Sequence, residues 1–504
     1  QLALADFAAG AYLPAAAFIN GLFDELAQRP RRGELLALLA LCQYRGGEAL
    51  RARLTAMRAL REFPEGSLSL EGRRASFKEW LEPLLKVAPS PEDVALPPRM
   101  ASPLTELWSE SWKAGTPFIT IPAQPAPGPS PLLYMARMSG ELPLMGVNPK
   151  DGSLAFTGGQ NGLLGLNQCI RTKDGVLLVF TRGFVFVTDR GETRWTARLA
   201  ASPDDVDVRD GMILYSSVGT RSASRQMRIA ALDAVSGAQT WETTLDAQDV
   251  LWLRQTPLGV VALLAGSEDQ LLLLDIESGR EIRRAKLPNA SARNSRARPF
   301  MLNDQLCITD ERGMVRLFAL EDFSVKAQVA SNLVRPSMCL PFKGQVLVVG
   351  YPGAALVDVA AGKTVWRATF DREDIHDRAL MGDVLALALS RDYETARVVG
   401  LSMADGKQVF SEVLETAEKE ERLKLKAAVA LQDGAAFGFA VTDISMGMPL
   451  LKGFRLVVLD KTGRRRLDWS KPAAGSVEYM QLSAVDGYIV VAADQTTHCF
   501  GAKE

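Results

Sequence analysis

The sequence predicts an all-β eight-bladed β-propeller preceded by an α-helical N-terminal domain, with seven blades as the alternative. Three observations lead to this prediction. Apolar residues recur every three or four positions up to about residue 115, and short runs of β-forming residues follow from about residue 132. Through this second region a turn pattern repeats at intervals of about 40 to 50 residues, the length that a four-stranded blade requires.

Residues 1–115 are expected to form the helical domain. The helical period is visible in AAAFINGLFDELAQ, GELLALLALCQ, EALRARLTAMRALREF, SFKEWLEPLLKVA and SPLTELWSESWK. Trp80, Trp108 and Trp112 fall at helical positions and are expected to anchor the core of this domain. The last two are four residues apart and would share one face of a helix.

Residues 116–131 are predicted to connect the two domains, and residues 132–504 to form the propeller. The connector contains IPAQPAPGPSP, whose proline density favours an extended segment without a core of its own. Beyond it, runs such as VLLVF, FVFVT, LLLLD, RLVVLD and YIVVAA are separated by turn signals and are typical of strands.

The repeat is clearest in AALDAVSGAQTW, where Asp233, Gly237 and Trp241 follow one another at steps of four residues. LVDVAAGKTVW repeats this spacing. The frame also fits other segments, two of them shortened and one without its glycine, through Asn148, Gly152 and Phe156; Gly191 and Trp195; Asp275, Gly279 and Arg283; Glu321, Val325 and Val329; Asp358, Gly362 and Trp366; Ser402, Gly406 and Phe410; and Gly463 and Leu467.

Eight such turns mark eight units. The last unit, GSVEYMQLSAVDGYIVVAADQTTHCF, supplies three strands before the sequence ends. A propeller removes its exposed sheet edges by closing into a ring. We therefore expect the missing fourth strand of the last blade to come from Leu154–Gly158, near the beginning of the propeller region.

The phrase Ala-Leu-Asp-x-x-x-Gly-x-x-x-Trp resembles the quinoprotein, or PQQ-like, repeat, and the resemblance covers about residues 132–504. An unrelated propeller family is the alternative. The resemblance implies that the glycine takes a positive φ in the hairpin between the third and fourth strands. It implies that the aromatic residue on the fourth strand docks between neighbouring blades. The predicted hairpin glycines are Gly152, Gly191, Gly237, Gly279, Gly362, Gly406 and Gly463, and the predicted docking residues are Trp195, Trp241, Trp366, Phe156 and Phe410.

Three positions depart from the pattern. Arg283, Val329 and Leu467 stand where the frame expects an aromatic residue. The seams beside them are expected to be less regular.

Proteins with this repeat divide into quinone-dependent dehydrogenases and non-catalytic scaffolds similar to the outer-membrane assembly protein BamB. The dehydrogenases combine a vicinal disulfide with calcium ligands and a catalytic carboxylate, whereas the five cysteines here stand far apart. His376 and His498 are the only histidines, and the sequence contains no CxxCH, HExxH or GxSxG. We predict a non-catalytic protein-interaction scaffold without cofactor or metal, and keep a quinone (PQQ)-dependent oxidoreductase as the alternative.

The predicted partners are other proteins in a multi-subunit bacterial assembly. With 58 basic and 59 acidic residues, the chain lacks the basic excess that nucleic acids attract. The apolar run LLALLALC is shorter than the roughly 20 residues of a membrane helix, so no direct membrane insertion is expected. Possible partner contacts are Glu418 and Lys419 in a charged stretch within the longest repeat interval, and Met446 and Met448 at a predicted hairpin tip.

The dispersed cysteines favour a reducing compartment, so a cytoplasmic location is predicted. A periplasmic or envelope-associated location is the alternative if a signal precedes Gln1.

Overall fold

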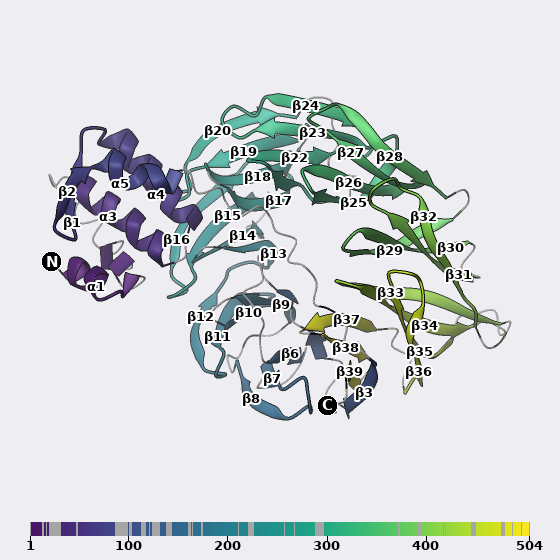
Figure 1. Ribbon diagram of the computed structural model, residues 1–504. Helices are drawn as coiled ribbons and strands as arrows, with labels where there is room; N and C mark the ends of the chain where they lie inside the picture. The colour runs from purple at the N-terminus through teal and green to yellow at the C-terminus, as the bar shows by residue number, and fades with distance from the viewer. Residues whose placement is uncertain are drawn as a thin grey trace.

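The computed structural model in Figure 1 is a ring of β-sheets with a group of helices beside it. It describes residues 2–12, 15–16, 18–19, 32–46, 49–85, 99, 103–111, 117–119, 121–122, 132–137, 144–159, 163, 165–172, 175–209, 211–219, 226–256, 258–266, 268–287, 297–370, 373–391, 395–416, 418, 420–444, 450–474, 479–485, 487–494 and 496–502.

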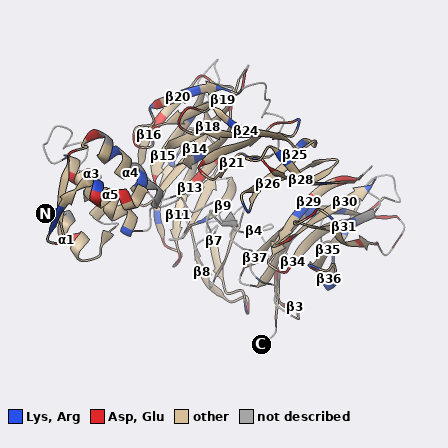
Figure 2. Cartoon of the chain, turned by 45° about the horizontal axis from the view of Figure 1, so that its top comes forward, with Lys and Arg blue, Asp and Glu red and all other residues tan. Residues whose placement is uncertain are grey.

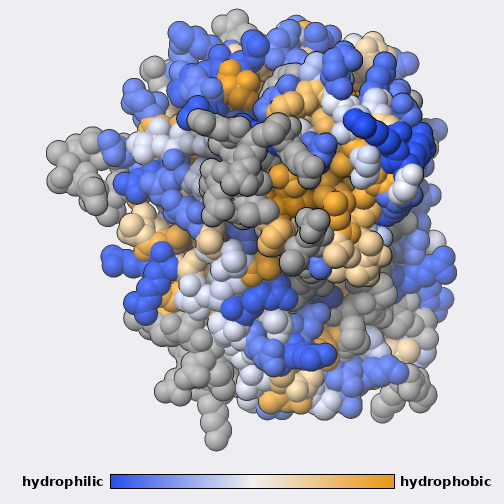
Figure 3. Space-filling view, turned by 90° about the vertical axis from the view of Figure 1, so that its left-hand side faces the viewer, coloured by the Kyte–Doolittle hydropathy of each residue, from blue (hydrophilic) through white to orange (hydrophobic). Residues whose placement is uncertain are grey.

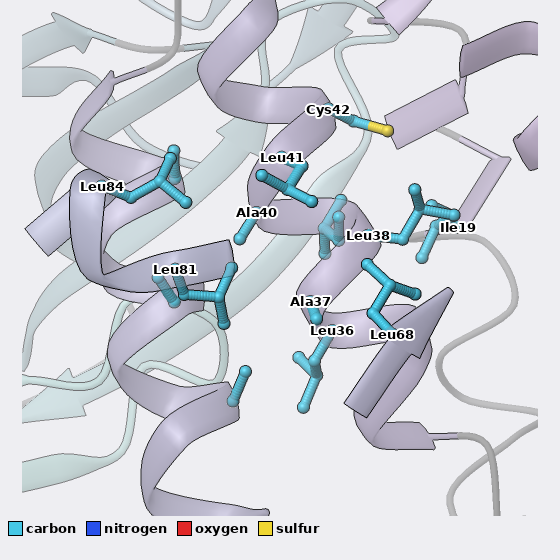
Figure 4. Close-up of a cluster of buried hydrophobic side chains, with 14 of the residues drawn as sticks. Ile19, Leu36, Ala37, Leu38, Ala40, Leu41, Cys42, Leu68, Leu81 and Leu84 are labelled. Carbon is cyan, nitrogen blue, oxygen red and sulfur yellow. The ribbon is translucent and has the colours of Figure 1, made fainter. Parts of the chain in front are cut away.

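The N-terminal part consists of four described helices and one β-hairpin. These elements are α1 (Leu2–Ala8), α3 (Arg32–Arg45), α4 (Ala49–Glu62), β1 (Ser67–Leu70), β2 (Arg73–Ser76) and α5 (Phe77–Leu85). Their buried side chains share one core, in which Leu81 and Leu84 of α5 approach α3 (Figure 4). Ser76 caps α5, because its Oγ accepts a hydrogen bond from the Glu79 backbone N–H and donates one to the Glu79 carboxylate.

The prediction of an α-helical domain over residues 1–115 is therefore wrong. The described helices are 7 to 14 residues long, and α3 and α5 pack against a two-stranded hairpin. The segment that contains Trp108 is a strand, β3 (Thr105–Ser111), and belongs to the propeller. Trp112 lies outside the described residues.

The described strands beyond β2 form nine sheets, which we number as blades in chain order. Blade 1 holds β4 (Pro117–Ile119), β6 (Leu133–Arg137), β7 (Leu144–Val147) and β8 (Leu154–Gly158); blade 2 holds β9 (Leu166–Thr172), β10 (Gly175–Phe180), β11 (Gly183–Thr188) and β12 (Thr193–Arg198), with β5 (Ile121–Pro122) parallel to β9; blade 3 holds β13 (Pro203–Arg209), β14 (Met212–Gly219), β15 (Gln226–Asp233) and β16 (Gln239–Leu245).

The remaining blades have the same antiparallel order. Blade 4 holds β17 (Asp249–Thr256), β18 (Gly259–Ala265), β19 (Gln270–Leu274) and β20 (Glu281–Lys286); blade 5 holds β21 (Phe300–Leu302), β22 (Gln305–Thr309), β23 (Met314–Ala319) and β24 (Val325–Ala330); blade 6 holds β25 (Val334–Phe342), β26 (Gln345–Tyr351), β27 (Gly353–Asp358) and β28 (Lys363–Thr369); blade 7 holds β29 (Asp374–Met381), β30 (Val384–Arg391), β31 (Thr395–Ser402) and β32 (Gln408–Leu414); blade 8 holds β33 (Glu421–Leu431), β34 (Gly434–Asp443), β35 (Leu450–Asp460) and β36 (Arg465–Pro472); blade 9 holds β37 (Met480–Val485), β38 (Tyr488–Ala493), β39 (Thr496–Gly501) and β3.

Both predicted blade numbers, eight and seven, are wrong, and the reason lies at the closure. β8 (Leu154–Gly158) does not complete the last blade, because it pairs with β7 in a separate blade 1. The closing strand is β3, which pairs with β39 from Thr105↔Gly501 to Ser111↔Thr496. The ring still closes by joining strands from its two ends, but the extra blade includes β4, from the range predicted to be a connector.

Burial explains why the middle and outer strands of a blade have different sequence patterns. All residues of β10 and β18 are buried, because neighbouring blades cover both faces of a middle strand. The outer strand β16 alternates instead, with Trp241 and Leu245 buried among exposed residues. Nine clusters of buried apolar side chains lie between consecutive blades in the described part of the chain, and one of them joins blade 9 to blade 1.

The N-terminal helices lie beside blades 3 and 4 (Figure 1). Arg58 of α4 forms an ion pair with Glu277 in the hairpin between β19 and β20. The face on which these helices lie is mostly hydrophilic, with an apolar area near its centre (Figure 3). No described helix is long and apolar enough to cross a membrane.

Candidate interaction surface on blade 8

Three tryptophans join neighbouring blades in the same way. Trp195, Trp241 and Trp366 lie on outer strands, and each ring packs on a hairpin glycine of the following blade, namely Gly237, Gly279 and Gly406. Each indole N–H also donates a hydrogen bond to a backbone carbonyl of that hairpin, at Ala234 (3.0 Å), Ile276 (2.7 Å) and Met403 (2.9 Å). A Cβ on any of these glycines would lie within 2.7 Å of the indole ring, so the seam needs a residue without a side chain.

Phe156 and Phe410 occupy the same position and pack on Gly191 and Gly463. They lack the indole hydrogen bond. Each lies against a glycine of its own blade as well, Gly146 or Gly400, where a Cβ would meet the ring.

Trp108 is a sixth docking residue, which the sequence reasoning assigned to a helix. Its ring packs on Gly152 of blade 1, and Nε1 donates a hydrogen bond to Pro149 O at 2.9 Å. The 41-residue separation between these partners resembles the 39, 35 and 37 residues that separate the other three tryptophans from their acceptors. That spacing was the signal that could have identified the closing strand.

In the seam between blades 4 and 5, the aromatic residue comes from the hairpin of the following blade, not from the outer strand of the preceding blade. Phe323 lies in the blade 5 hairpin at φ 57°, where the frame expects glycine, and its ring is buried beside Trp252 of blade 4. Its N–H donates to Ala319 O, as Gly237 N–H donates to Asp233 O. The predicted frame through Glu321, Val325 and Val329 is therefore shifted by two residues, and Ala327 occupies the docking position.

The seven predicted hairpin glycines all have positive φ, between 64° and 84°. Gly362 differs from the others, since among the described residues no atom lies within 4 Å of where its Cβ would stand. The seam between blades 5 and 6 is filled by aliphatic residues such as Val315, Val329 and Val357.

Blade 8 extends beyond its neighbour. Its first three strands have 11, 10 and 11 residues, whereas the first three strands of blade 7 have eight each. Three additional residues lengthen a strand by about 10 Å. At the extended end, on the side of blade 7, a cleft of about 760 Å³ opens between blade 8 and Val413, Glu415, Thr416, Glu418 and Glu421.

The cleft combines an apolar floor with charged walls. Leu423 of β33, Val441 of β34 and Pro472 of β36 provide apolar floor residues. Glu415, Glu418 and Glu421 line the side formed by the connection between β32 and β33. We call the described residues of this connection, 415–416, 418 and 420–421, the acidic lip.

Lys452 joins the acidic lip to the extended strands. Its Nζ lies 2.6 Å from Glu418 Oε2, 3.6 Å from Glu421 Oε1 and 3.2 Å from Asp443 Oδ2. Hydrogen bonds from Lys452 to Glu418 and Asp443 raise the pKa of the ammonium group, so Lys452 stays charged. The pairing between β34 and β35 skips Lys452, because Val441 pairs with Gly453 and Thr442 with Leu451. Lys452 therefore lies at a β-bulge.

At the other end of the cleft, two arginines hold the end of β32 against blade 8. Arg455 binds Asp468 through Nε and Nη2 at 2.8 and 2.7 Å and donates from Nη1 to Glu415 O at 2.6 Å. Arg465 binds Glu412 and Asp468 and donates to Val413 O. The hydrogen bonds from Arg455 lower the pKa of Asp468. This end is therefore a network of ion pairs that fixes the base of the lip.

Comparison with models of known protein families shows which family this propeller belongs to. The model of the family described as outer membrane protein assembly factor BamB matches residues 105–331 and 324–504. The chain belongs to this family. Among curated proteins, none matches the sequence.

Solved structures with a similar fold are only distantly related in sequence to this BamB-family chain. BamB from Moraxella catarrhalis is 16% identical with a TM-score of 0.47, over 67% of this chain and 94% of that one. The C-terminal WD40 domain of Sif2 is 9% identical with a TM-score of 0.46, over 66% of this chain and 93% of that one. Quinohemoprotein alcohol dehydrogenase ADHIIG from Pseudomonas putida HK5 is 9% identical with a TM-score of 0.42, over 80% of this chain and 77% of that one.

Of the four predicted partner contacts of the BamB-family chain, Glu418 lines the cleft, while Lys419, Met446 and Met448 lie outside the described residues. Ile444 and Leu450, which flank residues 445–449, are exposed. Sequence reasoning missed Lys452, Arg455, Arg465 and Asp468, although they lie in the longest repeat interval and the segment after it.

The cysteines and histidines do not line this cleft. All five cysteines are buried and free, and burial raises the pKa of each thiol. His376 Nε2 lies 2.6 Å from Ser390 Oγ, and His498 Nδ1 lies 2.7 Å from Glu106 Oε1. In the described part of the chain, no three His, Cys, Asp or Glu side chains come together as metal ligands.

Asp205 joins two blades. It lies in β13 and accepts a hydrogen bond from the Leu253 backbone N–H of β17 at 3.0 Å. Asp207 binds the Gln255 N–H in the same way.

Proposed function

We propose that this BamB-family chain is a non-catalytic scaffold that binds other proteins within a larger bacterial assembly, and that the extended end of blade 8 is its main contact surface. The observation that carries the proposal is the cleft formed where blade 8 extends past blade 7. The ion pairs around Lys452, Arg455 and Arg465 fix its walls, so a partner would meet a preformed surface and lose less conformational entropy on binding.

Family membership supports an assembly role, because the family is described as an outer membrane protein assembly factor. The cytoplasmic location drawn from the cysteines stays a prediction, and the family description favours the envelope alternative. Fractionation of the source cells would distinguish the two compartments.

Affinity purification of the full chain from its native cells tests the scaffold role. We expect recovery in a stoichiometric complex with at least one other protein, measured by native mass and by densitometry. Recovery as a monomer, with quinone absorbance and dye-linked dehydrogenase activity, would overturn the proposal and favour the oxidoreductase.

A further inference from the structure

We infer that the blade 8 cleft binds an extended segment of a partner protein in which an apolar side chain is flanked by lysine or arginine. This inference rests on the proposed scaffold function and specifies the chemistry of the partner.

The shape of the cleft fits a single extended chain. Its floor is one face of a β-sheet, with Leu423 and Val441 on neighbouring strands and Pro472 beyond them. An extended segment has side chains on alternating sides at about 3.3 Å per residue. It can therefore place one apolar side chain on this floor while its neighbours point to the walls. A volume of about 760 Å³ is enough for a few residues of such a segment.

The charge of the lip selects basic flanking residues. Glu415, Glu418 and Glu421 line this side of the cleft, and Asp443 lies beside them in an ion pair with Lys452. Lys452 adds one positive charge from blade 8 and is shared among Glu418, Glu421 and Asp443. Four negative charges and one positive charge leave this side of the cleft at −3.

The other end of the cleft does not cancel this charge. Arg455 and Arg465 form ion pairs with Asp468 and Glu412, and each also donates a hydrogen bond to a backbone carbonyl, that of Glu415 or Val413. With Lys471, which also lines the cleft, this end contributes three positive and two negative charges, so the charges around the cleft sum to −2. A lysine or arginine entering the cleft meets carboxylates such as that of Glu418, whose side chain is 59% exposed and accessible to a partner.

A protein segment fits these features better than an anionic surface would. Acidic and basic residues both occur along the outer ends of the blades, and no large face of a single sign is seen in Figure 2. A phosphate-rich ligand would be repelled by the acidic lip, which a basic peptide would instead approach favourably.

Fluorescence anisotropy with the full chain and a fluorescein-labelled octapeptide of alternating lysine and leucine tests the inference. We expect saturable binding that weakens with salt. Matched peptides in which glutamate replaces lysine, or serine replaces leucine, are expected to bind on the order of tenfold more weakly or not at all. Equal binding of the glutamate peptide would overturn the charge argument, and equal binding of the serine peptide would overturn the role of the floor.

Variants of the chain test whether the peptide binds in the cleft. We expect Glu415→Gln combined with Glu418→Lys to weaken binding of the lysine–leucine peptide on the order of tenfold, whereas Glu321→Lys, in the exposed hairpin of blade 5, leaves it nearly unchanged. Peptide-dependent protection of residues 413–423 from hydrogen exchange is a second readout. Loss of affinity in both variants, or no protection there, would refute the cleft as the binding site.

Failure of this inference differs from failure of the scaffold proposal. If the native complex forms and survives the two cleft substitutions while the peptide does not bind, the cleft assignment is wrong and the scaffold stands. If the wild-type chain forms no complex, the scaffold proposal itself is wrong.

Discussion

At the residue scale, six of the nine seams between the described blades depend on a matched pair of one aromatic side chain and one glycine. Trp241 fills the space above Gly279, and its only polar atom is satisfied by Ile276 O. The same pairing recurs for Trp108, Trp195 and Trp366. Where the glycine position holds Phe323, the outer strand of the preceding blade has Arg283 at the docking position, so the bulky residue has changed sides.

Truncation of a docking tryptophan should be costly. We expect Trp241→Ala to lower the free energy of unfolding by about 3 to 5 kcal/mol, the usual range for a buried Trp or Phe, because the side chain is only 7% exposed. Val235→Ala, in the exposed hairpin of the same blade, should change it by less than about 0.5 kcal/mol. Urea titration, with unfolding followed by circular dichroism in the far ultraviolet, measures both free energies. Equal losses would show that the seam does not depend on the indole.

Phe323 should be as important as a docking tryptophan, although it lies in a turn. We expect Phe323→Ala to cost about 3 to 5 kcal/mol, since the ring is 6% exposed between Trp252 and Phe318. Phe323→Gly combined with Arg283→Trp recreates the arrangement of the other seams and should recover part of this loss in the same titration. A cost below about 1 kcal/mol for Phe323→Ala would contradict the reversed seam.

At the element scale, the closing strand β3 places a carboxylate beside a histidine of the neighbouring strand β39. β3 contributes Glu106, which binds His498 of β39, and the imidazole packs on Trp469 of β36 at 4.6 Å between ring centroids. Burial lowers the pKa of His498, Lys471 acts in the same direction, and Glu106 opposes them. The folded protein therefore favours the neutral imidazole.

Stability should decrease as the pH falls below about 6.5, the pKa of histidine in an unfolded chain. Below that pH the unfolded chain binds a proton at His498 that the folded chain resists, so the free energy of unfolding falls until the folded pKa is passed. We expect the melting temperature of the wild type to decline between pH 7.5 and pH 5.5 more steeply than that of His498→Gln. Parallel pH profiles for the two proteins would rule out this contribution.

At the scale of the whole molecule, the strand that closes the ring precedes the first blade in the sequence. β3 completes blade 9 by pairing with the edge of β39, and it joins blade 9 to blade 1 by packing Trp108 against Gly152. The N-terminal helices contact the ring from outside through the ion pair between Arg58 and Glu277.

Two truncations separate these roles. A chain that begins at residue 99 keeps β3 and should melt as a closed ring. A chain that begins at residue 117 lacks β3 and exposes the edge of β39, so we expect it to be less stable by at least the roughly 3 to 5 kcal/mol of one buried tryptophan and to associate through the free edge. Thermal melting and light scattering measure these effects, and identical behaviour of the two chains would disprove the closing role of β3.

The sequence by itself determined the repeat, the PQQ-like family and the positions of most hairpin glycines and docking aromatics. These features are local, because a residue of positive φ and an aromatic residue four positions later lie within one hairpin. The sequence also indicated, through its longest repeat interval, where the ring departs from regularity.

Only the tertiary structure decided the number of blades, the closing strand and the cleft on blade 8. Closure pairs Thr105 with Gly501, across almost the whole chain, and no local pattern distinguishes β3 from β8 as the strand that does so. The helical period around Trp108 was misleading because a bulge between Glu106 and Trp108 breaks the alternation of a strand. The cleft arises from a difference in length between adjacent blades, and its walls join residues of β32 to residues of β35 and β36. Such relations between distant segments follow from packing, which the order of residues along the chain does not display.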